Sequence, residues 1–236
     1  MSIILLLLRL PILVVHILVG LFTILFFPKE PKNFKNSHYR IMMLWMNILS
    51  SILGIKVDIR GIPDQSANLF VSNHVTYLDI IIINKLLPVN FIAKEEISSW
   101  PVIGRLASKT GTLFIKRGDN VESSKMIYEM EERFKLQNKI VFFPEGKIGN
   151  GKRVRKFHYK LFKSIENKEL YIQPIAIRYP TGYPINNNYS EIISDKSLKG
   201  EMFSLYLKFL MRRRSHVILI FIDKVSTRDY KNETIT

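Results

Sequence analysis

The sequence contains no cysteine among its 236 residues. Disulfide bonds, thiolate metal ligands and a cysteine nucleophile are therefore excluded, and a protein that faces the cytosol is expected. No serine stands where a nucleophile elbow would place it. The sequence also lacks internal repeats, low-complexity tracts, and the recognition-helix, zinc-finger and aromatic-platform patterns of nucleic-acid binders. A nucleophile for any group transfer is therefore expected to come from the substrate.

Acidic residues are scarce: 20 Asp and Glu stand against 35 Lys and Arg, for a formal net charge of +15. Such an imbalance indicates an anionic partner, for which nucleic acid, an acidic protein and an anionic membrane or phospholipid all qualify. Hydrophobic residues make up 47% of the chain, which suffices for a sizeable core. The length fits one domain with an appendage.

The amino terminus carries the longest apolar run, from Ile3 to Phe27. About 25 apolar residues can span a bilayer, and the run is too long for a signal-peptide core. Four cations follow at once: Lys29, Lys32, Lys35 and Arg40. By the positive-inside rule they place the rest of the chain in the cytoplasm, so we expect a protein of the cell membrane. The pattern leaves open whether the segment spans the bilayer or lies in one leaflet.

A second apolar helix is predicted over Tyr39–Leu53, where apolar residues fall on one stripe and Gly54 ends the pattern. Together the two segments suggest a membrane-docking hairpin, although the second helix can equally pack on the following domain. We therefore expect two parts, a membrane-binding segment over residues 1–54 and a catalytic domain over residues 55–236.

Strand patterns and helix patterns alternate along the rest of the chain. The predicted strands are Ile55–Arg60, Leu69–Val71, Val89–Ala93, Thr112–Ile115, Ile140–Phe143, Tyr171–Tyr179 and Val217–Val225. The helices predicted between them follow His74, run from Ser98 to Ser108 and from Glu122 to Leu136, occupy the later part of Val154–Ile165, and lie near Glu201–Arg213. This alternation predicts an α/β fold with a mixed, mostly parallel sheet flanked by helices.

Polar residues gather at the carboxyl ends of these predicted strands. They are Asn73, His74, Lys94, Lys116, Arg117, Glu145 and Gly146. Ligands of open α/β sheets bind outside the carboxyl ends of the strands, so these residues are candidates for one site.

His74 and Asp79 form the first candidate pair, on a predicted strand-to-helix turn. Five residues separate them, about one helical turn, so the carboxylate can reach the imidazole. A histidine held by a carboxylate has a fixed tautomer and a stabilised cationic form, as a general base requires.

Four motifs in order resemble those of the glycerolipid acyltransferases, the lysophosphatidate acyltransferase family. They are Asn73-His74-x4-Asp79, Gly111–Arg117, Phe143-Pro-Glu-Gly146 and Gln173-Pro-Ile-Ala-Ile177. The resemblance covers roughly residues 55–178 and stands behind an apolar amino terminus, as in that family.

The resemblance implies transfer of a fatty acyl group from acyl-CoA or acyl carrier protein to the hydroxyl of a lysophospholipid, chiefly 1-acyl-sn-glycerol-3-phosphate. His74 would act as general base with Asp79 behind it. Lys94, Lys116 and Arg117 would bind acceptor phosphate. Glu145 and Gly146 would shape the acceptor site. No metal and no bound cofactor are implied.

The third motif departs from the family, which often continues Thr-Arg-Ser where this chain has Lys147-Ile148-Gly149. Ile148 cannot bind phosphate. Either a neighbouring cation makes the phosphate contact in its place, or the acceptor is not lysophosphatidate. The run from Glu145 to Phe162 is reminiscent of a branch that acylates lyso-ornithine lipids, our alternative acceptor. A non-catalytic basic module on anionic membranes is the alternative from another class. A hydrolase would need a metal or a protein nucleophile, and neither pattern occurs.

Overall fold

A computed structural model of the chain describes residues 2–30, 34–116, 120–149, 155–166, 168–180 and 195–228. Within them, one eight-stranded sheet has the order β1-β7-β6-β2-β5-β3-β4, and β8 pairs with β6. The strands are β1 (Ile55–Arg60), β2 (Leu69–Ser72), β3 (Val89–Lys94), β4 (Leu113–Ile115), β5 (Lys139–Phe142), β6 (Tyr171–Arg178), β7 (Ser215–Phe221) and β8 (Val225–Ser226). Neighbouring strands are parallel except that β6 runs antiparallel to β7 and β8. The predicted mixed, mostly parallel sheet is confirmed.

Helices cover both faces of this sheet. They are α1 (Ser2–Thr23), η1 (Ile24–Phe26), α2 (Asn36–Ile52), α3 (Leu78–Asn84), η3 (Glu95–Ser99), α4 (Ile103–Lys109), α5 (Asn120–Lys135), η4 (Tyr159–Ile165) and α6 (Asp195–Leu210), where η marks a 3-10 helix. Successive side chains of a strand point to opposite faces, so the central strands feed two cores. Phe70 of β2 packs in a core with α2, α3 and α6, whereas Leu69 and Val71 pack in a second core with α5 and η4.

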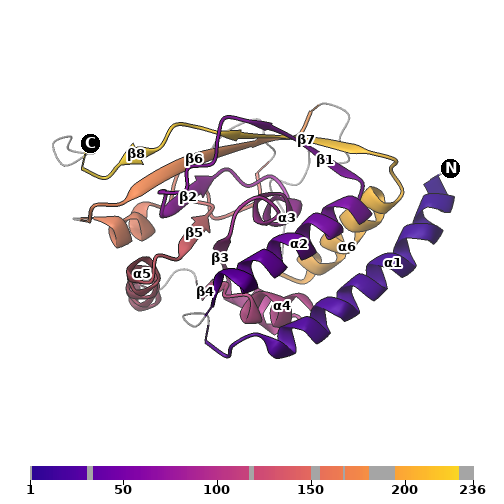
Figure 1. Cartoon of the computed structure of the whole chain (residues 1–236), viewed down its shortest axis with the longest axis horizontal. Coiled ribbons are helices and arrows are strands. Elements are labelled where there is room, and N and C mark those ends of the chain that lie inside the picture. Colours follow the sequence, from indigo (N-terminus) through magenta and orange to yellow (C-terminus); the bar gives the residue numbers. More distant parts are fainter. Residues whose placement is uncertain are drawn as a thin grey trace.

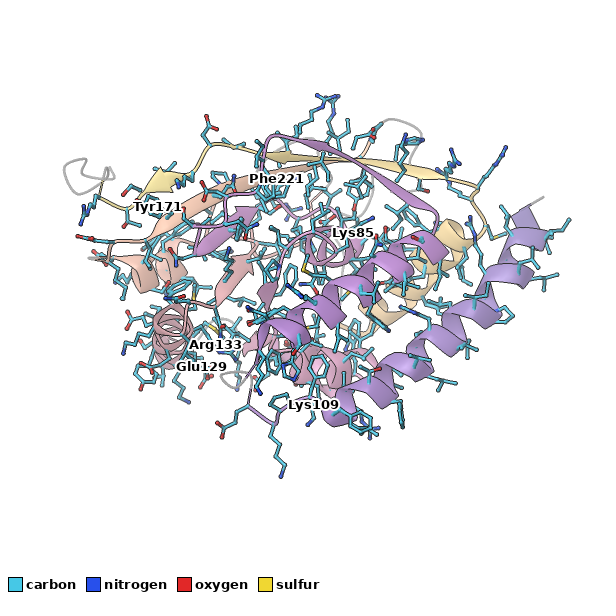
Figure 2. All side chains as sticks on the ribbon, viewed as in Figure 1. Lys85, Lys109, Glu129, Arg133, Tyr171 and Phe221 are labelled. Atoms are coloured by element: carbon cyan, nitrogen blue, oxygen red, sulfur yellow. The ribbon has the colours of Figure 1, made fainter. Side chains whose placement is uncertain are left out.

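The two amino-terminal helices differ in what they bury. In Figure 1, α1 runs along the outside of the molecule, with α2 and α6 between it and the sheet. Leu49 and Leu53 place the end of α2 in the main core, which confirms the prediction that this helix packs on the domain. The α1 helix instead keeps most of its large apolar side chains exposed, and they project outward in Figure 2.

Polar contacts of Arg9 hold the middle of α1 against the end of α6. The Arg9 guanidinium donates hydrogen bonds to the carbonyl oxygens of Leu210, Arg212 and Arg213, where α6 ends and turns toward β7. A cation there satisfies carbonyls that the end of a helix leaves without partners. The middle of an otherwise apolar helix is thereby attached to the far end of the chain.

Three segments differ from the sequence prediction. The helix predicted from Ser98 to Ser108 is divided between the end of η3 and α4, which begins only at Ile103 after Pro101. The single strand predicted over Val217–Val225 is divided into β7 and β8, which pair with opposite halves of β6. Pro174 lies between those halves and has no N–H to donate, so the ladder is interrupted there. The helix predicted in the later part of Val154–Ile165 is the short η4, and Val154 itself lies outside the described residues.

Candidate active site

His74 lies in the turn that joins β2 to α3, and Asp79 lies in the first turn of α3. His74 Nδ1 is 2.9 Å from Asp79 Oδ2, so the predicted contact between the two side chains is confirmed. Since Nδ1 is engaged with the carboxylate, the ring presents Nε2 to any substrate. The imidazole remains partly accessible, with 14% of its side chain exposed.

The Asp79 carboxylate is fully buried and is satisfied by several donors. Oδ2 also accepts hydrogen bonds from the backbone N–H groups of Val75 (2.6 Å) and Thr76 (3.0 Å). Oδ1 accepts a hydrogen bond of 2.6 Å from the hydroxyl of Tyr179. A negative charge near the amino end of α3 is also favoured by the helix dipole. These contacts compensate the burial of the charge and fix the carboxylate beside His74.

The loop after β5 covers the other side of His74. The Phe143 ring stacks on the imidazole with 4.0 Å between ring centroids and 14° between planes. The backbone N–H of Gly149 donates a hydrogen bond of 2.6 Å to the carbonyl oxygen of His74. The third predicted motif therefore contacts the first, as expected for loops at the carboxyl ends of the neighbouring strands β2 and β5.

The fourth motif joins them through Asn73. Its side-chain amide donates to the carbonyl oxygen of Ile177 at 2.9 Å and accepts from the N–H of Ile177 at 2.7 Å. This two-point contact continues the parallel β2–β6 ladder past the end of β2. The ends of β2, β5 and β6 are thus tied to one another around the imidazole.

Glu145 and Gly146 lie in the turn after β5, as predicted. The Glu145 side chain is buried, and its Oε2 accepts a hydrogen bond of 3.1 Å from the N–H of Arg155. The Glu145 carboxylate therefore joins the turn after β5 to the backbone of Arg155 and does not face solvent. Gly146 has φ of +65°, a left-handed conformation that favours glycine, and a Cβ there would lie 2.9 Å from Cδ2 of His158.

Gly146→Ala is expected to lower kcat about tenfold, because left-handed strain of roughly 1–2 kcal/mol and the contact with His158 displace the loop that covers His74. Acyl transfer and the thermal midpoint should be measured for Gly146→Ala and for Gly146→Ala/His158→Ala. The double variant removes the steric part, so it should recover some of the activity. Wild-type kcat in Gly146→Ala would show that the loop tolerates a side chain here.

Two of the predicted phosphate-binding cations lie on other strands of the sheet. Lys94 ends β3 and forms an ion pair of 2.9 Å with Glu96. Lys116 is exposed just after β4, which is three strands from β2, or roughly 14 Å between backbones. Arg117 lies outside the described residues. His74, Asp79, Glu145 and Gly146 lie in the neighbouring loops after β2 and β5.

A large apolar cavity of about 190 Å³ lies between the amino-terminal helices and the sheet. Its walls come from α1, α2, α3, β3, α4 and α6 and include Trp45, Tyr77, Phe91, Trp100 and Tyr206. Phe91 lies behind Phe143, with 6.2 Å between the ring centroids, so the cavity wall is one ring away from the imidazole. Burial raises the pKa of Tyr206 to about 12, so this phenol remains neutral at cellular pH.

Sequence analysis missed the cavity, the Phe143 stack and the Tyr179 contact. The sequence predicts Phe143 only as the first residue of the third motif, and it predicts Tyr179 only as the last residue of a strand. Neither residue type carries a local signal for these contacts. Within the described ranges, no three His, Asp or Glu side chains gather closely enough to hold a metal ion.

Comparison with known proteins identifies the family. The model of the Acyltransferase family matches residues 55–178, more than half of the chain. This chain belongs to the Acyltransferase family. The matched segment of the acyltransferase begins with β1, ends with β6 and contains the His74–Asp79 pair and all four motifs.

Three relatives extend this finding. The acyltransferase is 35% identical over 180 residues to a lyso-ornithine lipid O-acyltransferase of Pseudomonas aeruginosa, covering 72% of this chain and 69% of that protein. It is 30% identical over 147 residues to a 1-acyl-sn-glycerol-3-phosphate acyltransferase of Neisseria gonorrhoeae, covering 61% and 57% of the two chains. The crystal structure of the 1-acyl-sn-glycerophosphate acyltransferase PlsC of Thermotoga maritima has the same fold, with a TM-score of 0.65, 17% identity and coverage of 98% and 88%.

Proposed function

We propose that this acyltransferase transfers a fatty acyl group from a thioester, acyl-CoA or acyl carrier protein, to the free hydroxyl of a lysolipid. One observation carries the proposal: a His–Asp pair with a partly exposed imidazole lies beside an apolar cavity and an exposed apolar helix. This combination fits a reaction that activates an alcohol attached to a lipid.

His74 is the general base in this proposal. Its Nε2 removes the proton from the acceptor hydroxyl while the hydroxyl oxygen attacks the thioester carbonyl carbon. The resulting imidazolium is stabilised by the Asp79 carboxylate. When the tetrahedral intermediate collapses, the C–S bond breaks and the imidazolium returns the proton to the leaving thiolate. An ester and a free thiol result, and the enzyme is unchanged.

The apolar cavity accommodates the acyl chain in this proposal. Its lining is almost entirely hydrocarbon and aromatic, and no Lys, Arg, Asp or Glu side chain contributes to it within the described residues. An alkyl chain placed there leaves water without breaking any hydrogen bond of the protein. Phe91 in the cavity wall lies next to the Phe143 ring that stacks on the imidazole, so in this proposal the acyl chain extends from that wall to the reacting carbon.

The exposed apolar surface of the amino-terminal helix supports a site at the membrane surface. The α1 face that points away from the domain consists of large, exposed apolar side chains, and Ile41, Leu44 and Ile48 of α2 are exposed as well. Because Arg9 holds the middle of α1 on the domain, the helix lies in one leaflet with its axis along the surface. The cations Lys29, Lys35 and Arg40 keep the domain on the cytoplasmic side. Residues 1–54 thus bind membrane lipids, and residues 55–236 carry the chemistry.

Lysophosphatidate is the predicted acceptor, and lyso-ornithine lipid is a second candidate favoured by two observations. The Pseudomonas aeruginosa relative, at 35% identity over 72% of this chain, is named for the second acceptor. Ile148 also stands where the lysophosphatidate motif often has an arginine. Incubation of the purified enzyme with acyl-CoA or acyl carrier protein and a panel of lysolipids, followed by lipid mass spectrometry, tests both. If no lysolipid is acylated with either donor, the proposed function is wrong.

Ile148→Arg is expected to raise kcat/KM for lysophosphatidate relative to lyso-ornithine lipid by about tenfold, because a guanidinium can pair with the phosphate. The kcat/KM ratio of the two acceptors is the measurement. Ile148→Met is the matched control, since it keeps an uncharged side chain of similar size, and it should leave the ratio unchanged. If Ile148→Arg and Ile148→Met change this kcat/KM ratio equally, position 148 takes no part in headgroup recognition.

The alternative function is that of a non-catalytic basic module that binds anionic membranes. This function would use only surfaces away from the His74–Asp79 site. It would predict salt-sensitive binding that survives loss of both His74 and Asp79. Membership of an enzyme family supports the catalytic proposal over this one.

A further inference from the structure

Tyr179 is the residue that directly follows β6, and it is a second partner of the Asp79 carboxylate. Its hydroxyl donates a hydrogen bond of 2.6 Å to Oδ1, whereas His74 Nδ1 lies 2.9 Å from Oδ2. The imidazole and the phenol therefore bind opposite oxygens of one buried carboxylate. Asp79 cannot rotate without breaking at least one of these contacts.

The phenol is held in place by the core and by the neighbouring strand. Tyr179 packs against the main hydrophobic core, which contains Ile177 and Leu78. The two hydrogen bonds between Asn73 and Ile177 fix the end of β6 beside the turn that carries His74. The end of β6 and its contact with Asn73 thus present the tyrosine to Asp79.

We propose that Tyr179 is a positioning residue, which keeps the Asp79 carboxylate oriented and ionised behind the His74 base. The inference rests on the proposed function, because the base must have a reaction to serve. Tyr179 lies one residue beyond the segment that the family model matches, so family membership alone assigns it no role.

The direction of the effect follows from the charge on Asp79. A hydrogen bond to a carboxylate stabilises the ionised form, so its removal makes the carboxylate a better proton acceptor. A stronger acceptor behind the ring stabilises the imidazolium that His74 becomes when it takes the substrate proton. Removal of the phenol is therefore expected to make this imidazolium release its proton at a higher pH.

Tyr179→Phe tests the inference, because it removes one oxygen atom and keeps the ring. We expect kcat to fall about tenfold, with KM for both substrates within twofold of wild type, and the acidic limb of the pH–kcat profile to move upward by about one pH unit. Tyr171→Phe is the matched control. Tyr171 begins the same strand at the end opposite the site and is labelled at the edge of the molecule in Figure 2. It should leave kcat and the profile unchanged.

A double-mutant cycle with Asp79→Asn separates action through Asp79 from a general structural effect. If Tyr179 acts through the carboxylate, Tyr179→Phe/Asp79→Asn should be no slower than Asp79→Asn alone. Multiplied losses in the double variant would overturn the inference, as would a wild-type pH profile in Tyr179→Phe. Incorporation of 3-fluorotyrosine at position 179 provides an isosteric variant with a stronger donor. It should move the acidic limb downward, and an unmoved limb would contradict the inference even if Tyr179→Phe folds poorly.

A readout without lipid distinguishes failure of this inference from failure of the proposed function. Diethyl pyrocarbonate modifies neutral imidazoles, so peptide mass spectrometry can follow modification of His74 against pH, with the exposed His216 as internal reference. The midpoint for His74 should rise by about one pH unit in Tyr179→Phe. If wild-type enzyme acylates no lysolipid but this midpoint still moves, the proposed function is wrong and the role of Tyr179 stands. An unmoved midpoint overturns the role of Tyr179.

Discussion

His74→Ala is expected to lower kcat for acyl transfer by about 10²–10⁴-fold, because the alanine leaves the acceptor hydroxyl without a general base. KM should change little, since the apolar cavity and the membrane face do not include the imidazole. The measurement is the initial rate of lysolipid acylation in reconstituted vesicles. The rate should be taken with the acceptor that the panel identifies.

The matched control is His216→Ala, which removes an exposed imidazole from β7 and should retain wild-type activity. Thermal melting of both variants reports whether the Phe143 stack on His74 contributes to folding rather than to chemistry. Near-complete activity in a folded His74→Ala protein would remove the base from the mechanism. Equal losses in the two variants would point to an effect common to any histidine replacement.

Replacing three exposed leucines of α1 and the adjoining η1 with asparagine is expected to lower partitioning into phospholipid vesicles by roughly 10³-fold. Leu7, Leu18 and Leu25 are 66%, 58% and 70% exposed, so they contribute little to the fold. Each buried leucine is worth about 1.5–3 kcal/mol when it leaves water, and a total of about 4 kcal/mol already corresponds to 10³-fold. Co-sedimentation with vesicles of phosphatidylglycerol and phosphatidylethanolamine gives the partition coefficient.

The same number of substitutions at exposed apolar residues elsewhere forms the control. Ile62, Val121 and Leu136 are 82%, 61% and 48% exposed, and their replacement with asparagine should leave partitioning unchanged. Because the sequence has no cysteine, single cysteines at Ile3 and Leu25 also report the orientation of α1. An impermeant maleimide should label both ends of the helix from one side of the vesicle. Labelling from opposite sides would establish a spanning helix.

The parts of the site that sequence analysis predicted depend on short separations along the chain. His74 and Asp79 are five residues apart across the turn from β2 into α3, so their short separation along the chain brings them together. The alternation of strands and helices predicts that the first and third motifs lie at the same edge of the sheet. This rule holds because parallel strands end on the same side, whatever side chains they carry.

The parts that were missed depend on long-range packing. Tyr179 is 100 residues from Asp79, and the contact exists because β6 lies next to β2 in the sheet. That neighbour relation follows from the whole strand order, in which β6 and β2 are adjacent although three strands separate them in sequence. The cavity likewise needs α1, α2, α4 and α6 in place together. Hydrophobic periodicity predicts which face of each helix is apolar. It does not predict the cavity that forms when four such helices pack together.

Arg9 has a consequence for how the protein is made. Its three carbonyl acceptors are supplied by residues 201 to 204 positions later in the chain. At about 5–20 residues per second, a ribosome needs roughly 10–40 s to produce them after Arg9 has emerged. During that interval the guanidinium lacks these three carbonyl partners. The contact between α1 and the end of α6 therefore forms only after residue 213 has been synthesised.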